Sequence, residues 1–227
     1  VYVAYKKAFK SGGIDNSALP TASINPLSPT FEGFDALIYD SEEVDGFEIG
    51  LKSNLLDNNM RLNATYYKYE YTDLQVQLFD AAIIQFSTFN AGAVETEGFE
   101  ADLLWYTDIP GLSLRGQFAW TDATNTGDFI TPGGENLKGS KRSYSPEIAG
   151  SFGLSYDSGL SNGWRYNIST DARYSDEYGW GTYIDSPMQD SFWINDVALS
   201  LYSEDGKHSF NLIGRNLGDE IVIITGG

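Results

Sequence analysis

Residues 90–123 alternate apolar and polar side chains on both sides of a four-residue break, Asp-Ile-Pro-Gly at 108–111. After the break, Leu114 and Phe118 share one face and Arg115 lies on the other. Successive side chains of a β-strand point to opposite faces, so this period of two predicts a β-hairpin. One face of that hairpin is apolar and the other is charged, so the two faces must meet different surroundings.

The same alternation recurs along the chain and predicts nine strands. They cover residues 1–9, 45–56, 60–74, 92–107, 111–121, 147–157, 164–175, 191–203 and 207–217. The 15 tyrosines and 24 glycines fit an all-β chain better than a helical one. In the strand 60–74, Leu62 and Tyr66 share one face, whereas Tyr67 and Tyr69 take the other. A bulge or a change of environment along the strand explains this shift, and both explanations stay open.

The connections between the predicted strands alternate between short and long. Turns rich in Asp, Asn, Gly and Pro occupy 57–59, 108–111, 158–163 and 204–206. The long connections are 10–44, 75–91, 122–146 and 176–190. Aromatic residues gather near strand ends, at Trp105, Tyr106, Trp120, Tyr156, Trp164, Tyr174, Trp193 and Tyr202. Short turns at one end, longer loops at the other and aromatic girdles are typical of a membrane β-barrel, whereas periodicity alone also allows a soluble β-sandwich.

Composition excludes several classes of protein. The net charge of −18 argues against nucleic acid as a partner, because phosphate binding needs clustered cations. The absence of cysteine excludes a disulfide framework and a thiolate metal site. No run approaches the ~18–20 apolar residues of a membrane helix, but a barrel strand needs only ~9–11 residues of alternating character.

In a membrane barrel the apolar face contacts lipid and the polar face lines an aqueous lumen, the reverse of a soluble protein. Ten charged residues fall on the predicted polar faces, and we expect them to face the lumen: Glu48, Lys52, Glu100, Asp102, Arg115, Arg165, Asp171, Arg173, Asp196 and Arg215. They form either a binding surface for a polar solute or a network of ion pairs with neighbouring groups. We favour the network, because a filled lumen needs polar partners in any case.

Four segments carry motifs in a fixed order. The first is VYVAYKKAFKSGGI at the start of the chain, and the second includes Glu43, Phe47, Glu48, Ile49, Gly50, Leu51 and Lys52. The third contains Asn90, Ala91, Gly92, Gly98 and Glu100, and the fourth is GRNLGDE at 214–220. In these segments the chain resembles the TonB-dependent outer-membrane receptors, although Phe47 replaces the usual tyrosine and Gly218 stands where phenylalanine is common.

The resemblance implies a plugged barrel of about 22 strands, of which residues 1–227 form roughly nine in the C-terminal portion. The plug domain and the final strand have no counterpart in the sequence. An odd number of strands supports this interpretation, because single-chain bacterial barrels close with an even number. The resemblance further implies a cell outer-membrane location and contact with membrane lipid and lipopolysaccharide. It implies as partners the plug of the same protein, the TonB complex acting through that plug, and a transported small molecule.

The sequence offers no candidate for catalysis, and we expect no enzyme, metal site or cofactor. His208 is the one histidine and lacks partners for a catalytic triad. The acidic pairs Glu42–Glu43 and Glu204–Asp205 match no calcium-loop spacing.

The candidate ligand contacts are aromatic residues in the long connection 176–190, namely Tyr178, Trp180 and Tyr183. Aromatic faces stack on catechols, sugars and haem-like rings, although packing between loops would also explain these residues. A ferric siderophore is the commonest cargo of the resembling family, so we expect energised siderophore import, with saccharides, haem and cobalamin as the other cargoes that the resemblance allows. The alternatives are a passive porin or adhesin barrel and a soluble secreted β-sandwich.

Overall fold

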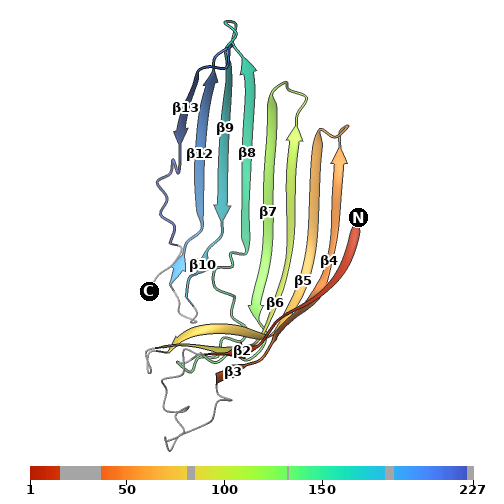
Figure 1. Ribbon diagram of the computed structural model, residues 1–227, viewed down its shortest axis with the longest axis vertical. Coiled ribbons are helices and arrows are strands. Elements are labelled where there is room, and N and C mark those ends of the chain that lie inside the picture. The colour runs from red at the N-terminus through yellow and green to blue at the C-terminus, as the bar shows by residue number, and fades with distance from the viewer. Residues whose placement is uncertain (16–36, 81–84, 132, 182–186, 224–227) are drawn as a thin grey trace, which may run out of the picture.

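Nine antiparallel strands form one sheet in the computed structural model, which describes residues 1–15, 37–80, 85–131, 133–181 and 187–223 (Figure 1). The order in the sheet is β1-β4-β5-β6-β7-β8-β9-β12-β13. The bounds are β1 (Tyr2–Lys10), β4 (Glu42–Leu55), β5 (Met60–Asp80), β6 (Gln85–Tyr106), β7 (Leu112–Asn125), β8 (Ile148–Gly159), β9 (Arg165–Ser175), β12 (Phe192–Tyr202) and β13 (Ser209–Gly214). Two short ribbons pair β2 (Gly13–Ile14) with β3 (Ile38–Tyr39) and β10 (Tyr178–Gly179) with β11 (Met188–Gln189). Among the described residues, no helix is long and apolar enough to span a membrane.

The nine predicted strands are confirmed, but the predicted long connection 75–91 is wrong. β5 continues to Asp80 and β6 begins at Gln85, with Val76 paired to Phe89. Pairing persists because the apolar side chains of this extension have a surface to pack against. Leu78 and Ala91 form a small core with residues of the segment between β7 and β8.

The β5–β6 hairpin bends sharply where it leaves the sheet and continues across its lower end (Figure 1). Asp73 has a left-handed backbone there, with φ of 53°. On the opposite strand, a side chain at Gly92 would place its Cβ 2.6 Å from the Asp128 carbonyl oxygen. The cross-strand pair Gln75 and Asn90 holds the bend, because both amides donate to the Asp40 carbonyl, at 3.0 and 3.1 Å.

The irregular face pattern of β5 reflects a change of environment rather than a bulge. Its pairing with β6 runs without a gap through Tyr66–Phe99 and Tyr67–Gly98. The Tyr67 ring lies over Gly98, where an added Cβ would meet its hydroxyl at 2.5 Å. The tyrosine therefore occupies the space above the glycine on the polar face, an arrangement that supports a glycine within a strand.

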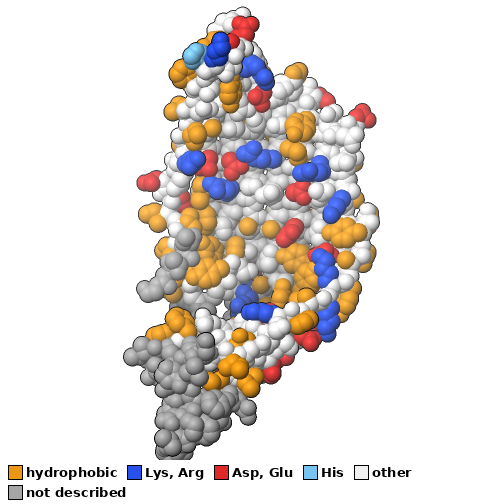
Figure 2. All heavy atoms as spheres, in the orientation of Figure 1, with side chains coloured by type: hydrophobic (Ala, Val, Ile, Leu, Met, Phe, Trp, Pro, Cys, Tyr) orange, Lys and Arg blue, Asp and Glu red, His pale blue; other side chains and the backbone are white. Residues whose placement is uncertain are grey.

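The two faces of the sheet differ in polarity, and the apolar face is not covered by a second layer among the described residues. Phe118 and Phe152 on that face are 44% and 52% exposed, although a soluble sandwich would bury them. The buried apolar residues of the sheet strands lie near the loop end instead, as Leu78, Ala91, Val94 and Ala123. Figure 2 shows the other face, on which basic and acidic side chains form a band across the middle.

Candidate functional site at the loop end of the sheet

The two ends of the sheet are unlike each other. Short turns join β4 to β5, β6 to β7, β8 to β9 and β12 to β13 at the upper end in Figure 1. The longer connections and both small ribbons lie at the lower end. We call this lower end the loop end. The asymmetry predicted from the sequence is therefore present, apart from the β5–β6 extension.

The segment 126–147 is anchored to the sheet at the loop end. The backbone amides of Thr126 and Gly127 donate to the Ala93 carbonyl, at 2.8 and 3.0 Å. Phe129 packs edge-on against Phe89, with ring centroids 6.2 Å apart. Because its first half is fixed in this way, the segment can present its later residues in a defined place.

Those later residues contact the β10–β11 ribbon. The Tyr144 amide donates to the Gly179 carbonyl at 2.8 Å, and the Tyr144 hydroxyl donates to the Trp180 carbonyl at 2.6 Å. The Tyr144 and Tyr178 rings lie 6.1 Å apart. Tyr144 also has a φ of 57°, a left-handed conformation that costs energy for a bulky residue. The structure thus brings together Tyr144, Tyr178 and Trp180, which we call the aromatic cluster.

Two of the three predicted ligand contacts belong to this cluster. Trp180 has a buried indole Nε1 without a hydrogen-bond acceptor among the described residues. The Tyr178 hydroxyl donates to the Ile223 carbonyl at 3.3 Å. The third predicted residue, Tyr183, lies outside the described residues. The sequence analysis missed Tyr144. Its one local indication was that it is an aromatic residue within a long connection.

A partly buried cation, Arg142, precedes Tyr144 by two residues in the sequence. The Arg142 Nη1 donates to the Asn125 side-chain oxygen at 3.3 Å. Burial lowers the pKa of the Arg142 guanidinium below its usual range, while the charge of Glu42 opposes that change. The group keeps its proton, since an arginine does so in proteins generally. The Arg142 side chain is thus held against β7, where Asn125 lies.

The predicted polar residues share one face wherever strand pairing defines it. Pairing places Glu48, Lys52, Glu100, Asp102, Arg115, Arg165, Asp171, Arg173 and Asp196 on the face opposite Phe118. Arg215 follows the last residue of β13, so the strand pairing does not define its face.

Many of these charges are paired within the sheet. Lys6 and Glu48 lie 2.6 Å apart, and Lys52 lies over the Tyr2 ring at 5.5 Å. Asp102 accepts from the Asn63 amide at 3.1 Å and lies 4.0 Å from Arg61. Glu100, Arg165 and Arg215 have no ion-pair partner within the described ranges.

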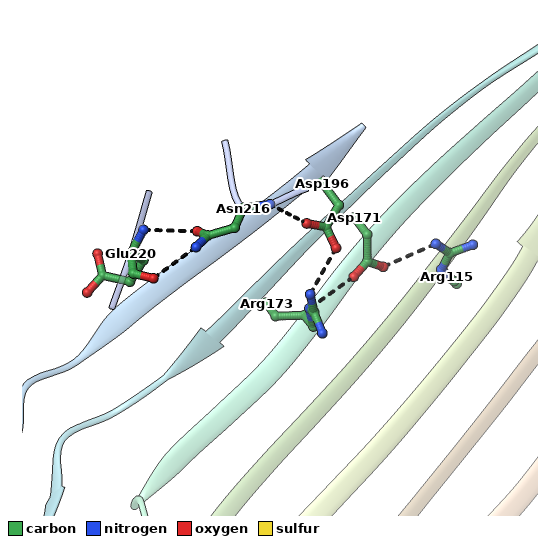
Figure 3. Close-up of polar contacts among 6 residues, drawn as sticks. All are labelled: Arg115, Asp171, Arg173, Asp196, Asn216 and Glu220. Atoms are coloured by element: carbon green, nitrogen blue, oxygen red, sulfur yellow. Dashed lines mark hydrogen bonds and ion pairs between the residues drawn. The ribbon is translucent and has the colours of Figure 1, made fainter. Parts of the chain in front are cut away.

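A ladder of ion pairs crosses this face from β7 to β12 (Figure 3). Arg115 contacts Asp171 at 3.1 Å, and Arg173 lies 3.6 Å from the same carboxylate. Arg173 then contacts Asp196 at 2.9 Å. Each side chain remains partly exposed, so water screens the individual pairs and the network acts mainly to order the surface.

Beside the ladder the polar face is hollowed. The hollow has a volume of about 670 Å³, and small residues, Ala119, Ala149 and Ser151, form part of its lining. Glu100 and Arg173 also line it. Phe192 and Ile194 share the lining with these charged side chains, so the hollow is mixed in polarity.

The described residues contain no group of three or more histidine, cysteine or acidic side chains placed to hold a metal ion. His208 lies by the β12–β13 turn, where its backbone amide donates to the Ser203 hydroxyl at 3.0 Å.

Comparison with known proteins places the chain in a wider context. A family model described as the TonB-dependent receptor-like β-barrel matches residues 1–217. No curated protein matches the sequence. Among solved structures, the ferric yersiniabactin uptake receptor FyuA from Yersinia pestis matches with a TM-score of 0.72 and 15% identity, over 96% of this chain and 29% of that receptor.

Two receptors from Acinetobacter baumannii are similar in the same way. The siderophore receptor PiuA has a TM-score of 0.68 and 21% identity, over 96% of this chain and 29% of its own. The ferric preacinetobactin receptor BauA has a TM-score of 0.67 and 15% identity, over 96% and 30%. The chain therefore spans about three tenths of the length of these receptors, and at these identities the likeness establishes the fold.

Proposed function

The chain belongs to the TonB-dependent receptor-like β-barrel family, and we propose that it forms the C-terminal part of a receptor barrel that imports a ferric siderophore. The barrels of this family are outer-membrane proteins, and the family consists of receptors and transporters rather than enzymes. Three of the similar structures are siderophore or ferric-siderophore receptors by name. In this proposal, energy comes from the TonB complex, which acts through a plug domain of the same protein.

The aromatic cluster at the loop end carries the proposal. The Tyr144 and Tyr178 rings lie 6.1 Å apart and Tyr144 is half exposed, so this pair offers ring surface to a flat ligand, and the Tyr144 hydroxyl donates to the carbonyl of the neighbouring Trp180. Catechol and other aromatic iron ligands stack on such rings.

The two faces of the sheet support the proposed position in an outer membrane. Phe118 and Phe152 would contact lipid, while the ion-pair ladder would face the lumen and the plug. Toward the loop end the lipid-side face becomes charged, where Lys68 lies 2.8 Å from Glu95 and 3.7 Å from Glu97. This change supports contact with lipopolysaccharide headgroups above an apolar band.

The two alternatives predict different behaviour. A soluble sandwich is excluded as the fold, because the described sheet leaves its apolar face uncovered and matches receptor barrels. A passive porin would let its solute pass without energy. Uptake of radiolabelled iron that stops on addition of a proton uncoupler supports the proposed receptor, and uptake that continues favours the porin.

Ligand contact is tested on the full-length receptor with a ferric tris-catecholate as the probe. We expect Trp180→Ala and Tyr178→Ala each to weaken binding about tenfold, the equivalent of ~1.4 kcal/mol. Trp164→Phe is the matched control, because Trp164 stacks on Phe210 near the opposite end of the sheet. Equal affinity in the wild type and in both loop-end variants would contradict the proposed site.

A further inference from the structure

The ion-pair ladder does not end within the sheet. The Asp196 carboxylate uses one oxygen for Arg173, at 2.9 Å, and the other for the backbone amide of Asn216, at 2.8 Å (Figure 3). Asn216 follows β13, so this carboxylate joins the polar face of the sheet to the segment beyond its last strand. Both oxygens accept strong hydrogen bonds, one of them from a charged donor.

A tight turn begins at this contact. Asn216 and Asp219 have left-handed backbones, with φ of 48° and 51°. The Asn216 side chain brackets the turn, because its Nδ2 donates to the Glu220 carbonyl at 2.8 Å and its Oδ1 accepts from the Glu220 amide at 3.0 Å. Residues 216–220 are thus held as one unit, and Asp196 fixes the start of that unit.

Three residues later the chain reaches the aromatic cluster. The Ile223 amide donates to the Gln189 side-chain oxygen at 2.8 Å, and the Ile223 carbonyl accepts from the Tyr178 hydroxyl. Gln189 and Tyr178 are cross-strand partners in the β10–β11 ribbon. We call residues 216–223 the strap, since it is tied at one end to Asp196 and at the other to this ribbon.

We propose that Asp196 is a positioning residue for the aromatic cluster and acts through the strap. Asp196 fixes the turn at Asn216, and the turn directs Ile223 toward the hydroxyl of Tyr178. The link between Glu220 and Ile223 is short, so a turn that moves carries its contact with Tyr178 along. This inference rests on the proposed role of the aromatic cluster in ligand contact.

Asp196 also couples the strap to the polar face of the sheet. Arg173 holds Asp196 from one side, so the orientation of the strap depends on the same carboxylate that completes the ladder. A group that competes for Arg173 or Asp196 on the polar face would therefore loosen the strap at the loop end. A continuous series of contacts thus runs from the polar face of the sheet, through the strap, to Tyr178.

The inference is tested by hydrogen–deuterium exchange on the purified full-length receptor without any ligand. Asp196→Ala should speed exchange of the strap amides and of the ribbon about fivefold or more, as expected when a charged hydrogen-bond acceptor is lost. Asp171→Ala is the matched control, because it removes a ladder carboxylate but leaves the contact between Asp196 and Asn216. Strap exchange in the control should equal that of the wild type.

A second variant breaks the strap from its other side. Asn216→Gly keeps the left-handed backbone and the backbone amide that donates to Asp196. It loses the two side-chain hydrogen bonds to Glu220. It should speed exchange at Ile223 while leaving the ladder intact, and if Asp196→Ala fails to assemble, unchanged exchange at Ile223 in this variant still overturns the inference. Wild-type exchange in both variants, or equally fast exchange in Asp171→Ala, overturns the inference.

Titration of the same variants with the ferric tris-catecholate separates this inference from the proposed function. If exchange rises in Asp196→Ala while Trp180→Ala and Tyr178→Ala bind normally, the strap is real and the ligand site is wrong. If those two variants lose binding while exchange in Asp196→Ala is unchanged, the ligand site stands and the positioning role fails.

Discussion

Asp171 and Asp196 are direct cross-strand partners on β9 and β12, and Arg173 contacts both carboxylates. Like charges placed directly opposite each other destabilise a sheet. The Arg173 guanidinium lies between the two carboxylates and attracts both of them. The arginine two residues along β9 therefore offsets the repulsion, together with Arg115, which contacts Asp171 from β7.

Removing the Arg173 guanidinium should leave the carboxylates of Asp171 and Asp196 to repel each other. We expect Arg173→Gln to lower the free energy of unfolding by about 1 kcal/mol, a modest value because all three side chains remain partly exposed. Urea denaturation of the receptor in phospholipid vesicles measures it. Adding Asp171→Asn to this variant should recover much of the loss, and no recovery would show that repulsion is not the cause.

Two neighbouring residues on β7 should differ strongly in how much the same substitution destabilises the barrel. Phe118→Arg places a charge on the proposed lipid face and should cost about 2–4 kcal/mol in a bilayer. Gln117→Arg adds the same charge on the polar face and should cost far less. Assembly yield in outer membranes and unfolding in vesicles provide the measurements. Equal losses in the two variants would contradict the orientation of the sheet.

The glycine beneath Tyr67 should not accept a side chain. A Cβ at Gly98 would lie 2.6 Å from the Trp120 carbonyl oxygen as well as 2.5 Å from the Tyr67 hydroxyl. We therefore expect Gly98→Ala to destabilise the barrel by about 1–3 kcal/mol, as overpacking usually does. At Gly116 the nearest heavy atom would be 3.9 Å away, so Gly116→Ala serves as the tolerated control in the same unfolding experiment.

The turn between β12 and β13 should contribute a small dependence of stability on pH. The Ser203 hydroxyl and the Lys207 amide donate to Asp205, and these hydrogen bonds lower the pKa of its carboxyl group. A carboxyl whose pKa is lower in the folded state stabilises that state above its unfolded pKa. This contribution disappears as the pH falls from the unfolded value through the folded one.

The contribution of Asp205 to stability is measured by comparing the urea midpoint of unfolding near neutral pH with the midpoint at acid pH. Asp205→Asn should reduce the loss of stability on acidification, and Ser203→Ala should reduce it by a smaller amount, because only one donor is removed. A wild-type pH response in Asp205→Asn would show that the carboxylate contributes nothing to the fold.

The nine strands, the two faces and the short turns followed from local patterns in the sequence. Alternation such as that from Leu114 to Phe118 depends on neighbours within one strand, and a strand imposes the same period wherever it lies. The same local logic failed at residues 75–91. The extended pairing of Val76 with Phe89 depends on Phe129 and Leu137, which lie far along the chain.

Tertiary structure alone decided which side chains meet at the loop end. Tyr144 and Trp180 are separated by a whole β-hairpin, and Asp196 meets Asn216 across a turn and another strand. Such contacts depend on the path of the connections and on backbone conformations such as the left-handed Asn216, which no short-range periodicity encodes. The sequence by itself determined a two-faced antiparallel sheet, and the folded chain determined the aromatic cluster and the strap that holds it.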